Sequence, residues 1–320
     1  MNNSDIIVSV RCIVFNHEPF LRQCLDGIVM QQTDFRFEAF VHDDASTDGS
    51  ADIIREYAER YPDIIKPYFE EENLYSKKDG SFRRVTYSRE NLRGKYIALC
   101  EGDDYWTDPL KLQKQVDYLE AHPDCMLCFT NAIMHWEDGS GKPDRLFAPD
   151  LEERDYLGTE TTMTWITPTA SLVYRRSVLE SDYYKNKVLA DKRVSFAGDI
   201  PLVLTCCHLG TIHALADVTC VYRRHPNGFM LSADSNRRIL SGDHKYSFYK
   251  AFGPEYVESS VFMSMYYYRL GLKQAKKERA WKNYVKILAR IIKVYSQHPY
   301  YAWKRAATVL RERRNRLASQ

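Results

Sequence analysis

The sequence of 320 residues has no apolar run that reaches the roughly 18 residues needed to cross a lipid bilayer. Its first apolar run, residues 6–10, stops at Arg11 and lacks the basic leader and small-residue cleavage site of a secretion signal. These absences predict a cytoplasmic protein. In a reducing cytoplasm the 8 cysteines are expected to remain free thiols.

Internal repeats and low-complexity linkers are absent too, and so is the cysteine spacing of a zinc site. One Cys-x-x-Cys occurs at Cys125 and Cys128, but no second pair follows it. It lies in a strand-like apolar run, where alternation points the two side chains to opposite faces. We therefore expect no structural zinc site at this pair.

Charge is distributed unevenly along the chain, although the formal net charge is only +2. Residues 273–320 contain 14 Lys and Arg but only two acids, Glu278 and Glu312. The remaining residues, 1–272, contain 31 basic and 41 acidic residues. A basic tail on an acidic body indicates a negatively charged partner for the tail, such as anionic lipid or nucleic acid.

Strand and helix patterns alternate in the first half of the chain. Apolar, β-branched runs predict strands at residues 6–15, 37–42, 64–69 and 96–100, with helical spacing between them, for example after Pro19. This alternation predicts an α/β domain with a mostly parallel sheet flanked by helices. Farther on, short runs predict strands at 170–174, 211–216 and 218–222, and the pattern is helical from about 236 to the end.

Two pairs of aspartates follow predicted strands. Asp43 and Asp44 come after the strand at 37–42, and Asp103 and Asp104 come after the strand at 96–100. Such pairs can hold a divalent cation, accept hydrogen bonds from a sugar, or cap the next helix. Because ligands bind beyond the carboxyl ends of parallel strands, two pairs at one edge favour a ligand site over simple capping.

Three segments together resemble the family 2 glycosyltransferases. They are Val8 to Phe15, the string Asp-Asp-Ala-Ser-Thr-Asp-Gly-Ser at 43–50, and the string Glu-Gly-Asp-Asp-Tyr-Trp-Thr-Asp-Pro at 101–109. The resemblance covers roughly residues 5–230, and the stretch at 94–109 is similar to bacterial members that build surface polysaccharides. It implies a GT-A fold, which is a Rossmann-like, mostly parallel sheet with helices on its faces. The helical pattern beyond residue 236 adds a C-terminal helical extension.

The resemblance also implies a division of the chain. Residues 1–235 would form the catalytic domain, with a nucleotide-sugar half at about 1–110 and an acceptor half at about 111–235. Residues 236–320 would form the basic helical extension.

The resemblance assigns donor-binding roles to matching residues. Phe15 would pack near a uracil ring, and Asp43 or Asp44 would accept the uracil N–H. Asp103 would contact the ribose or the sugar. Asp104 would hold Mn²⁺ or Mg²⁺, and His225 is a candidate for a further metal contact, although a lone histidine is as readily structural.

A catalytic base and an acceptor site are also implied. Asp199 opens an apolar helix where the family places its base, and capping of that helix is the alternative role. Trp106 and Trp165 are candidate contacts for the acceptor. The Gln-x-x-Arg-Trp motif and membrane spans of processive synthases are missing from the sequence. The resemblance therefore implies inverting transfer of one sugar per visit, from a UDP-linked donor to a saccharide or a lipid-linked saccharide.

Two other functions are alternatives. A nucleotidyltransferase would also place acids and a metal on such a sheet, but it normally has a glycine-rich basic loop after the first strand, unlike residues 14–18. A non-catalytic protein that binds sugar nucleotides or nucleic acid is the second alternative. Against nucleic acid stand the acidic body and the absence of a recognised motif.

The basic tail contains an amphipathic helix. Apolar and aromatic residues recur at helical spacing from Trp281 to Tyr295, whereas Lys282, Lys286 and Lys293 lie mostly on the other side. This pattern is typical of a helix that lies on a membrane surface, but equally of one that packs on the catalytic domain. A second basic helix is predicted at 303–316. The tail, residues 273–320, is thus a candidate for binding the inner face of the cytoplasmic membrane.

Overall fold

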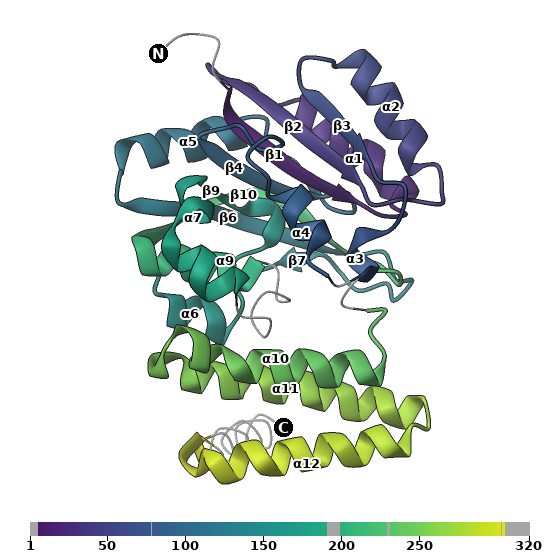
Figure 1. Cartoon of the computed structure of the whole chain (residues 1–320), viewed down its shortest axis with the longest axis vertical. Helices are drawn as coiled ribbons and strands as arrows, with labels where there is room; N and C mark the ends of the chain where they lie inside the picture. Colours follow the sequence, from purple (N-terminus) through teal and green to yellow (C-terminus); the bar gives the residue numbers. More distant parts are fainter. Residues whose placement is uncertain (1–5, 78, 191–198, 229–230, 302, 305–320) are drawn as a thin grey trace. The chain divides into compact units, whose positions relative to one another are not determined.

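The computed structural model describes residues 6–77, 79–190, 199–228, 231–301 and 303–304 (Figure 1). The chain forms two compact units. The first contains the strands β1 to β10, and the second contains the helices α10, α11 and α12.

The first unit is built on a ten-stranded sheet with the order β3-β2-β1-β4-β9-β6-β10-β5, in which β7 pairs with β6 and β8 pairs with β10. The strands are β1 (Ile6–Val14), β2 (Arg36–Asp43), β3 (Ile65–Phe69), β4 (Tyr96–Glu101), β5 (Tyr105–Trp106), β6 (Cys125–Trp136), β7 (Arg145–Leu146), β8 (Arg154–Asp155), β9 (Val173–Arg175) and β10 (Thr211–Arg224).

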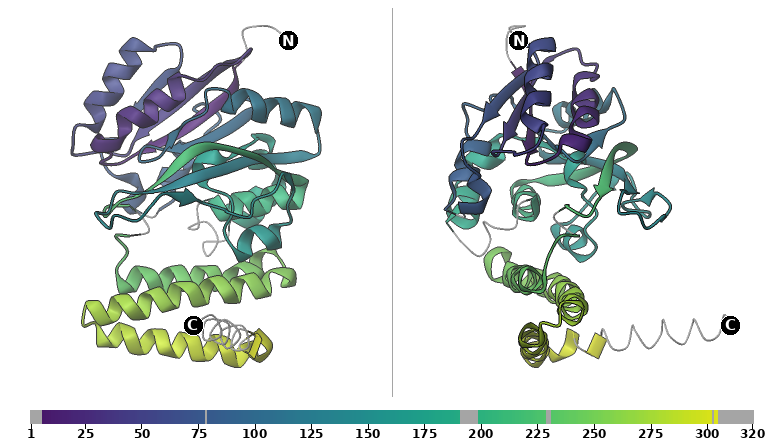
Figure 2. Two further views of the ribbon diagram at one scale, coloured as in Figure 1. Left: turned by 180° about the vertical axis from the view of Figure 1, so that it is seen from behind. Right: turned by 90° about the vertical axis from the view of Figure 1, so that its right-hand side faces the viewer.

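Helices cover both faces of this sheet. The helices and turns between its strands are α1 (Glu18–Val29), α2 (Ser50–Arg60), α3 (Leu74–Lys77), α4 (Ser81–Thr86), α5 (Lys111–Ala121), α6 (Gly158–Met163), the 3-10 turn η1 (Thr169–Ser171), α7 (Ser177–Glu180), the π-helical turn η2 (Tyr184–Leu189) and α9 (Asp199–Leu209). Figures 1 and 2 show α1 and α2 on one face and α9 on the other. Because both faces are covered, strands such as β1 are buried along most of their length and read as nearly continuous apolar runs.

The expected parallel sheet is present in the first half of the chain, where β3, β2, β1 and β4 all pair in parallel. Beyond β4 the sheet is mixed. Strand β9 pairs antiparallel with both β4 and β6, and β10 then runs parallel to β6. The α/β prediction is confirmed, with parallel pairing concentrated around β1.

Two strand predictions are wrong in detail. The run at 170–174 was expected to be one strand, but it begins in the turn η1 because Ser171 donates both its N–H and its hydroxyl to the carbonyl of Pro168. The runs at 211–216 and 218–222 form one strand, β10, rather than two. Irregular register between Ala214 and Cys220 accounts for the interrupted sequence pattern.

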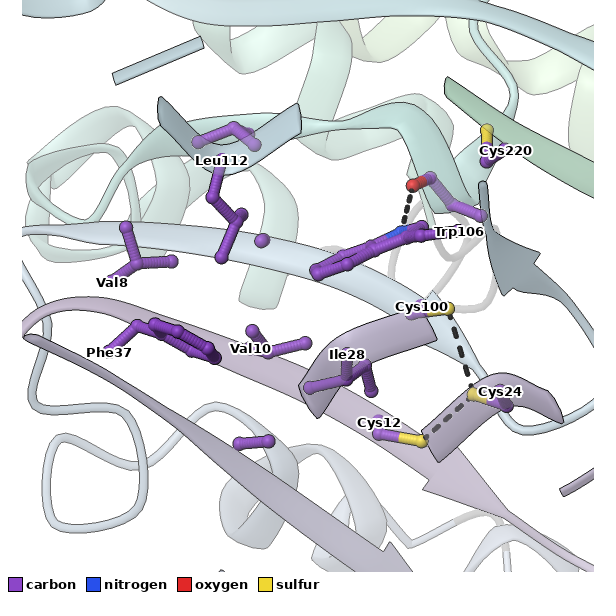
Figure 3. Close-up of a cluster of buried hydrophobic side chains, with 14 of the residues drawn as sticks. Val8, Val10, Cys12, Cys24, Ile28, Phe37, Cys100, Trp106, Leu112 and Cys220 are labelled. Atoms are coloured by element: carbon purple, nitrogen blue, oxygen red, sulfur yellow. Dashed lines mark hydrogen bonds between the residues drawn. The ribbon is translucent and has the colours of Figure 1, made fainter. Parts of the chain in front are cut away.

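The core beneath the sheet combines the apolar faces of α1, α2 and α5 with side chains from β1, β2 and β4. Three thiols lie at its centre, with the sulfur of Cys24 3.8 Å from that of Cys12 and 3.7 Å from that of Cys100 (Figure 3). All eight cysteines are free thiols.

The second unit contains α10 (Ser235–Phe252), the 3-10 turn η3 (Pro254–Tyr256), α11 (Val257–Lys277) and α12 (Trp281–Gln297). Helix α11 packs against both α10 and α12 around a core that includes Val261, Tyr268 and Ile287. Helical structure after residue 236 is therefore confirmed. Most of the second basic helix predicted at 303–316 lies outside the described residues. Within the described part of the chain, no helix combines the length and the apolar character that a membrane span requires.

Candidate active site

The carboxyl ends of β1, β2 and β4 meet at one edge of the sheet, which we call the site edge. In the register of these strands, Asp43 pairs with Val14 and Glu101 pairs with Ile13. The two acidic clusters therefore end the strands on either side of β1. This is the arrangement that their positions after parallel strands predict.

Two loops at the site edge hold each other in place: the β1 loop, residues 15–18, and the β2 loop, residues 44–50. Three N–H groups of the β1 loop donate to side chains of the β2 loop at 2.9–3.1 Å, namely Asn16 to Ser46, His17 to Ser50 and Glu18 to Asp48. In return, the Glu18 carboxylate accepts the N–H of Gly49 at 2.8 Å. These contacts satisfy amide groups at the beginnings of α1 and α2 that have no partner within their own helices.

Each loop also contains a residue with an unusual backbone conformation. Asn16 has φ of 57° and Ala45 has φ of 60°. Residues other than glycine adopt such values at a cost of order 1–3 kcal/mol, and they persist where surrounding contacts enforce them. Here the hydrogen bonds between the two loops provide that enforcement, so the backbone at the site edge is held in a defined shape.

The donor-binding candidates lie on these loops. Phe15 is exposed at the end of β1. Both carboxylate oxygens of Asp44 accept backbone N–H groups, from Leu74 at 2.7 Å and Tyr75 at 3.0 Å, so Asp44 caps the short helix α3. Asp43 instead accepts the N–H and the hydroxyl of Ser46 within its own turn, and burial raises its pKa.

Asp103 lies between two histidines. Its Oδ2 atom is 3.1 Å from Nε2 of His225, at the end of β10, and 4.0 Å from Nε2 of His17 in the β1 loop. Burial opposes ionisation of Asp103, but the contact with His225 and the nearby His17 hold its pKa below the usual value. Asp103 is therefore an ionised carboxylate at neutral pH. The pKa of His17 is lowered, chiefly by burial, which favours its neutral form.

The neighbouring Asp104 has a different environment. Its side chain is buried, with 4% of the residue exposed, and its Oδ1 accepts the N–H of Arg223 at 2.9 Å. Burial, with a further contribution from the charge of Asp103, raises its pKa well above the usual value. The sequence predicted that Asp104 and His225 share a cation. The structure instead pairs His225 with Asp103 and places Asp104 in a structural contact to β10.

Arg223, which sequence reasoning missed, joins the site edge to β10. Its guanidinium donates to the carbonyl of Asp103 at 2.9 Å and to the Glu137 carboxylate at 3.0 Å. It also packs over the rings of Phe20 and Tyr105. The Arg-Arg-His run at 223–225 could have predicted this role. It follows a predicted strand, and a strand that ends near the acidic cluster places its last residues beside that cluster.

Glu101 opens the acidic string and faces Arg11, whose Nη2 is 3.1 Å from its Oε1. Its other oxygen, Oε2, is buried and has no hydrogen-bond partner among the described residues. Burial raises the pKa of Glu101 to about 7 against the opposing charge of Arg11, and the carboxylates of Asp103 and Asp199 add to the rise. Asp199 is thus within electrostatic range of the site edge, although it belongs to α9.

Asp199 is the first residue of α9. Its Oδ2 accepts a hydrogen bond from the hydroxyl of Thr169, in η1, at 2.6 Å. The turn η1 is itself fixed, because the carbonyl of Ala170 accepts the indole N–H of Trp106 at 2.8 Å and that of Ser171 accepts the Gln115 amide at 2.9 Å. Thr169 was not predicted, and an isolated threonine provides no sequence signal for such a contact.

Trp106 was predicted to contact the acceptor, and this prediction is wrong. The residue is 1% exposed and lies in the core (Figure 3). The ammonium of Lys111 is 4.5 Å from its ring centre. Its indole N–H is used internally by Ala170. Trp165 is half-buried in the segment before η1, and its acceptor role stays a prediction.

A divalent cation fits the chemistry of these residues only in part. Within the described residues, no three His, Cys, Asp or Glu side chains are grouped as a metal site. Asp103 and His225 nevertheless supply one ionised carboxylate and one imidazole, and the buried Nδ1 of His17 has no hydrogen-bond partner in the described structure. Mg²⁺ and Mn²⁺ sites with few protein ligands take their remaining ligands from water and substrate phosphates. The pair therefore fits a cation that is shared with a phosphorylated ligand.

Comparison with known proteins agrees with this architecture. Residues 9–182 match the family model described as glycosyl transferase family 2. A protein of Mycobacterium tuberculosis, named only as uncharacterized, is 38% identical over 231 residues, which are 72% of this chain and 62% of that protein. An uncharacterized glycosyltransferase of Nostoc is 28% identical over 71% of this chain and 68% of its own length.

Among solved structures, S. aureus TarS in complex with UDP-GlcNAc superposes with a TM-score of 0.63 at 17% identity, covering 90% of this chain and 81% of that one. The chain belongs to glycosyl transferase family 2, and its fold is the GT-A fold that the sequence predicts. It spans 62% of the length of the mycobacterial relative.

Proposed function

We propose that the protein is an inverting, metal-dependent glycosyltransferase that moves one sugar at a time from a UDP-linked donor to a saccharide or lipid-linked saccharide. The observation that carries this proposal is the pairing of the ionised Asp103 with His225 at the edge where Asp43 also lies. The family match supports the reaction class, since it covers the site edge from β1 to η1.

The donor would occupy the loops of the site edge. Phe15 offers an exposed ring beside the end of β1, where a nucleobase can pack. We assign the contact to the base N–H to Asp43, because Asp44 has both carboxylate oxygens engaged at the beginning of α3. S. aureus TarS, which shares this fold, was solved in complex with UDP-GlcNAc, which supports a UDP-sugar as the donor.

The cation role moves from Asp104 to Asp103. An ionised carboxylate such as Asp103 binds Mn²⁺ or Mg²⁺ well, whereas burial disfavours the charged form of Asp104 and raises its pKa. Asp103 and His225 would hold the cation. It would supply positive charge to the diphosphate that leaves with the nucleotide.

Asp199 would act as the base. Its carboxylate takes the proton of the acceptor hydroxyl while the hydroxyl oxygen forms a bond to the anomeric carbon and the bond from that carbon to the diphosphate oxygen breaks. Attack from the face opposite the leaving group inverts the configuration, so an α-linked donor gives a β-linked product. Thr169 would orient the carboxylate through its 2.6 Å hydrogen bond.

The acceptor is assigned only by class. Resemblance to bacterial enzymes of surface polysaccharide synthesis supports a saccharide acceptor, either free or linked to lipid. A lipid-linked acceptor would place the reaction at the inner face of the cytoplasmic membrane, with Trp165 as the candidate contact near the acceptor. No nucleic acid partner is proposed.

The decisive experiment is a UDP-release screen over nucleotide sugars, with Mn²⁺, with Mg²⁺ and with chelator. We expect release from one class of UDP-sugar only when the cation is present. Asp199→Asn should abolish transfer to the acceptor while leaving UDP binding intact. Transfer at the wild-type rate by this variant would refute the base assignment, and release that is independent of metal would refute the cation assignment.

A further inference from the structure

Helix α12 presents two apolar faces, and only one of them packs against the described residues of its unit. Ile287 and Val294 are buried against the core of the second unit, with Tyr284, Ile291 and Tyr295 partly buried beside them. The sequence left two roles open for this helix, membrane binding and packing on the catalytic domain, and each of them requires one apolar face. Packing among the described residues accounts for one face and leaves the other exposed.

The second face is an exposed apolar stripe, formed by Trp281, Val285, Leu288 and Ile292. These residues are 39–67% exposed and follow the spacing i, i+4, i+7, i+11, which aligns them along one side of the helix. Four exposed large apolar side chains in register are not the scattered single residues found on ordinary surfaces.

A basic row lies next to this stripe. Lys282, Lys286 and Lys293 are all exposed, and α12 contains no acidic residue. Among the described residues, no carboxylate lies within salt-bridge distance of these three lysines. Arg290, by contrast, pairs with Asp243 of α10 at 3.3 Å. The three ammonium groups are therefore available for an external partner.

We propose that the stripe and the basic row of α12 together form a docking surface for a membrane with anionic headgroups. The stripe enters the boundary between headgroups and acyl chains, and the lysines reach the headgroup phosphates at the level of the helix axis. Trp281, at the first turn, is suited to the interface because its ring joins an apolar body to a polar N–H.

The combination of features selects this partner. A nucleic acid would engage the lysines but leave Val285, Leu288 and Ile292 in water. A purely apolar protein surface would cover the stripe but leave the lysines without a role. An anionic lipid surface uses both, and each lysine near such a surface strengthens binding about fivefold.

Flotation of the full chain with vesicles tests the proposal, using phosphatidylglycerol mixed with phosphatidylcholine and phosphatidylcholine alone. The wild type should float with the anionic vesicles and lose most of this binding at high salt. The stripe variant, Val285→Asn with Ile292→Asn, should bind at least tenfold more weakly to both vesicle types. The lysine variant, with Lys282, Lys286 and Lys293 each changed to Gln, should lose roughly 100-fold on anionic vesicles and little on neutral ones.

Leu240 on α10 and Tyr266 on α11 provide a matched control, since both are exposed apolar residues outside the stripe. Leu240→Asn with Tyr266→Asn should float like the wild type. Equal flotation of the stripe variant and the wild type would overturn the proposal. So would a wild type that never floats but forms a dimer that the stripe variant abolishes, since the occupant would then be a second copy. The result is independent of the catalytic assignments, because UDP release with a water-soluble acceptor is measured separately and should be unchanged in the stripe variant.

Discussion

The carboxylate of Asp103 lies 3.1 Å from the imidazole of His225, although 122 residues separate the two in sequence. The contact joins the end of β4 to the end of β10, two strands that are not neighbours in the sheet. It also favours the ionised form of Asp103, whereas the adjacent Asp104 is buried and accepts the N–H of Arg223.

Exchange of each aspartate for asparagine separates their roles. Asp103→Asn should weaken Mn²⁺-dependent UDP binding at least tenfold, because even indirect contacts to a metal cost about 10- to 100-fold when removed. Asp104→Asn should change it little, since the Asp104 side chain is buried and its Oδ1 already accepts the N–H of Arg223. Calorimetric titration of UDP with and without Mn²⁺ measures both. If Asp104→Asn loses the metal dependence and Asp103→Asn keeps it, the original assignment to Asp104 is restored.

Thr169 should act on turnover rather than on donor binding. Thr169→Val removes the hydroxyl that donates to Asp199, and a hydrogen bond to a charged group contributes about 1.5–3 kcal/mol. We expect kcat to fall by roughly 10- to 100-fold while the KM for the donor is unchanged. Thr169→Ser keeps the hydroxyl and should recover most of the rate. A serine variant as slow as the valine variant would show that the hydroxyl is not what matters.

Trp106 should prove structural. Trp106→Phe leaves the carbonyl of Ala170 without its donor and a cavity beside Lys111, which together should lower the free energy of unfolding by about 2–4 kcal/mol. Urea denaturation followed by circular dichroism measures the change. The KM for the acceptor should not respond. Unchanged stability with a raised acceptor KM would return Trp106 to the acceptor site.

Lys111 should give the protein a pH-dependent stability in the alkaline range. The side chain is fully buried, and burial lowers its pKa to about 8, below the value of 10.5 expected when unfolded. Between these values the unfolded state binds more protons than the folded state, so the contribution of Lys111 to stability improves as pH rises. At pH 7 the charged group is destabilising by the full amount, on the order of 3 kcal/mol.

The variant Lys111→Met isolates this effect, since other groups titrate equally in both proteins. The difference in unfolding free energy, wild type minus variant, should rise steadily from pH 8 to pH 10. A difference that stays constant over this range would mean that the lysine does not change its pKa on folding.

Short-range patterns in the sequence predicted the strands and helices of the first half of the chain. Apolar runs located β1, β2 and β4, and their parallel pairing followed from the helices between them. Because strand ends were known, Asp43 and Asp103 could be placed at the same edge. The sequence therefore predicted the fold and the edge of the sheet at which the candidate site lies.

The sequence did not predict the contacts that give neighbouring residues different environments. Asp103 and Asp104 are adjacent in the sequence, and their different environments include contacts with two residues of a distant strand, His225 for Asp103 and Arg223 for Asp104. The prediction that Trp106 contacts the acceptor was wrong for a similar reason. Strand β5 has two residues and is too short for alternation to reveal which side chain points inward. Thr169 contacts Asp199 across 30 residues through a turn that no periodic pattern describes.

The mutual capping of the β1 and β2 loops limits how this protein can be re-engineered. The side chains that complete the first turn of α1 belong to the β2 loop, and Glu18 of the β1 loop serves α2 in return. A loop exchanged alone with a relative would leave amide groups at both helix starts without acceptors. Recombination between family members should therefore succeed only when residues 15–18 and 44–50 are transplanted together, which makes the loop pair, rather than either motif, the smallest exchangeable part.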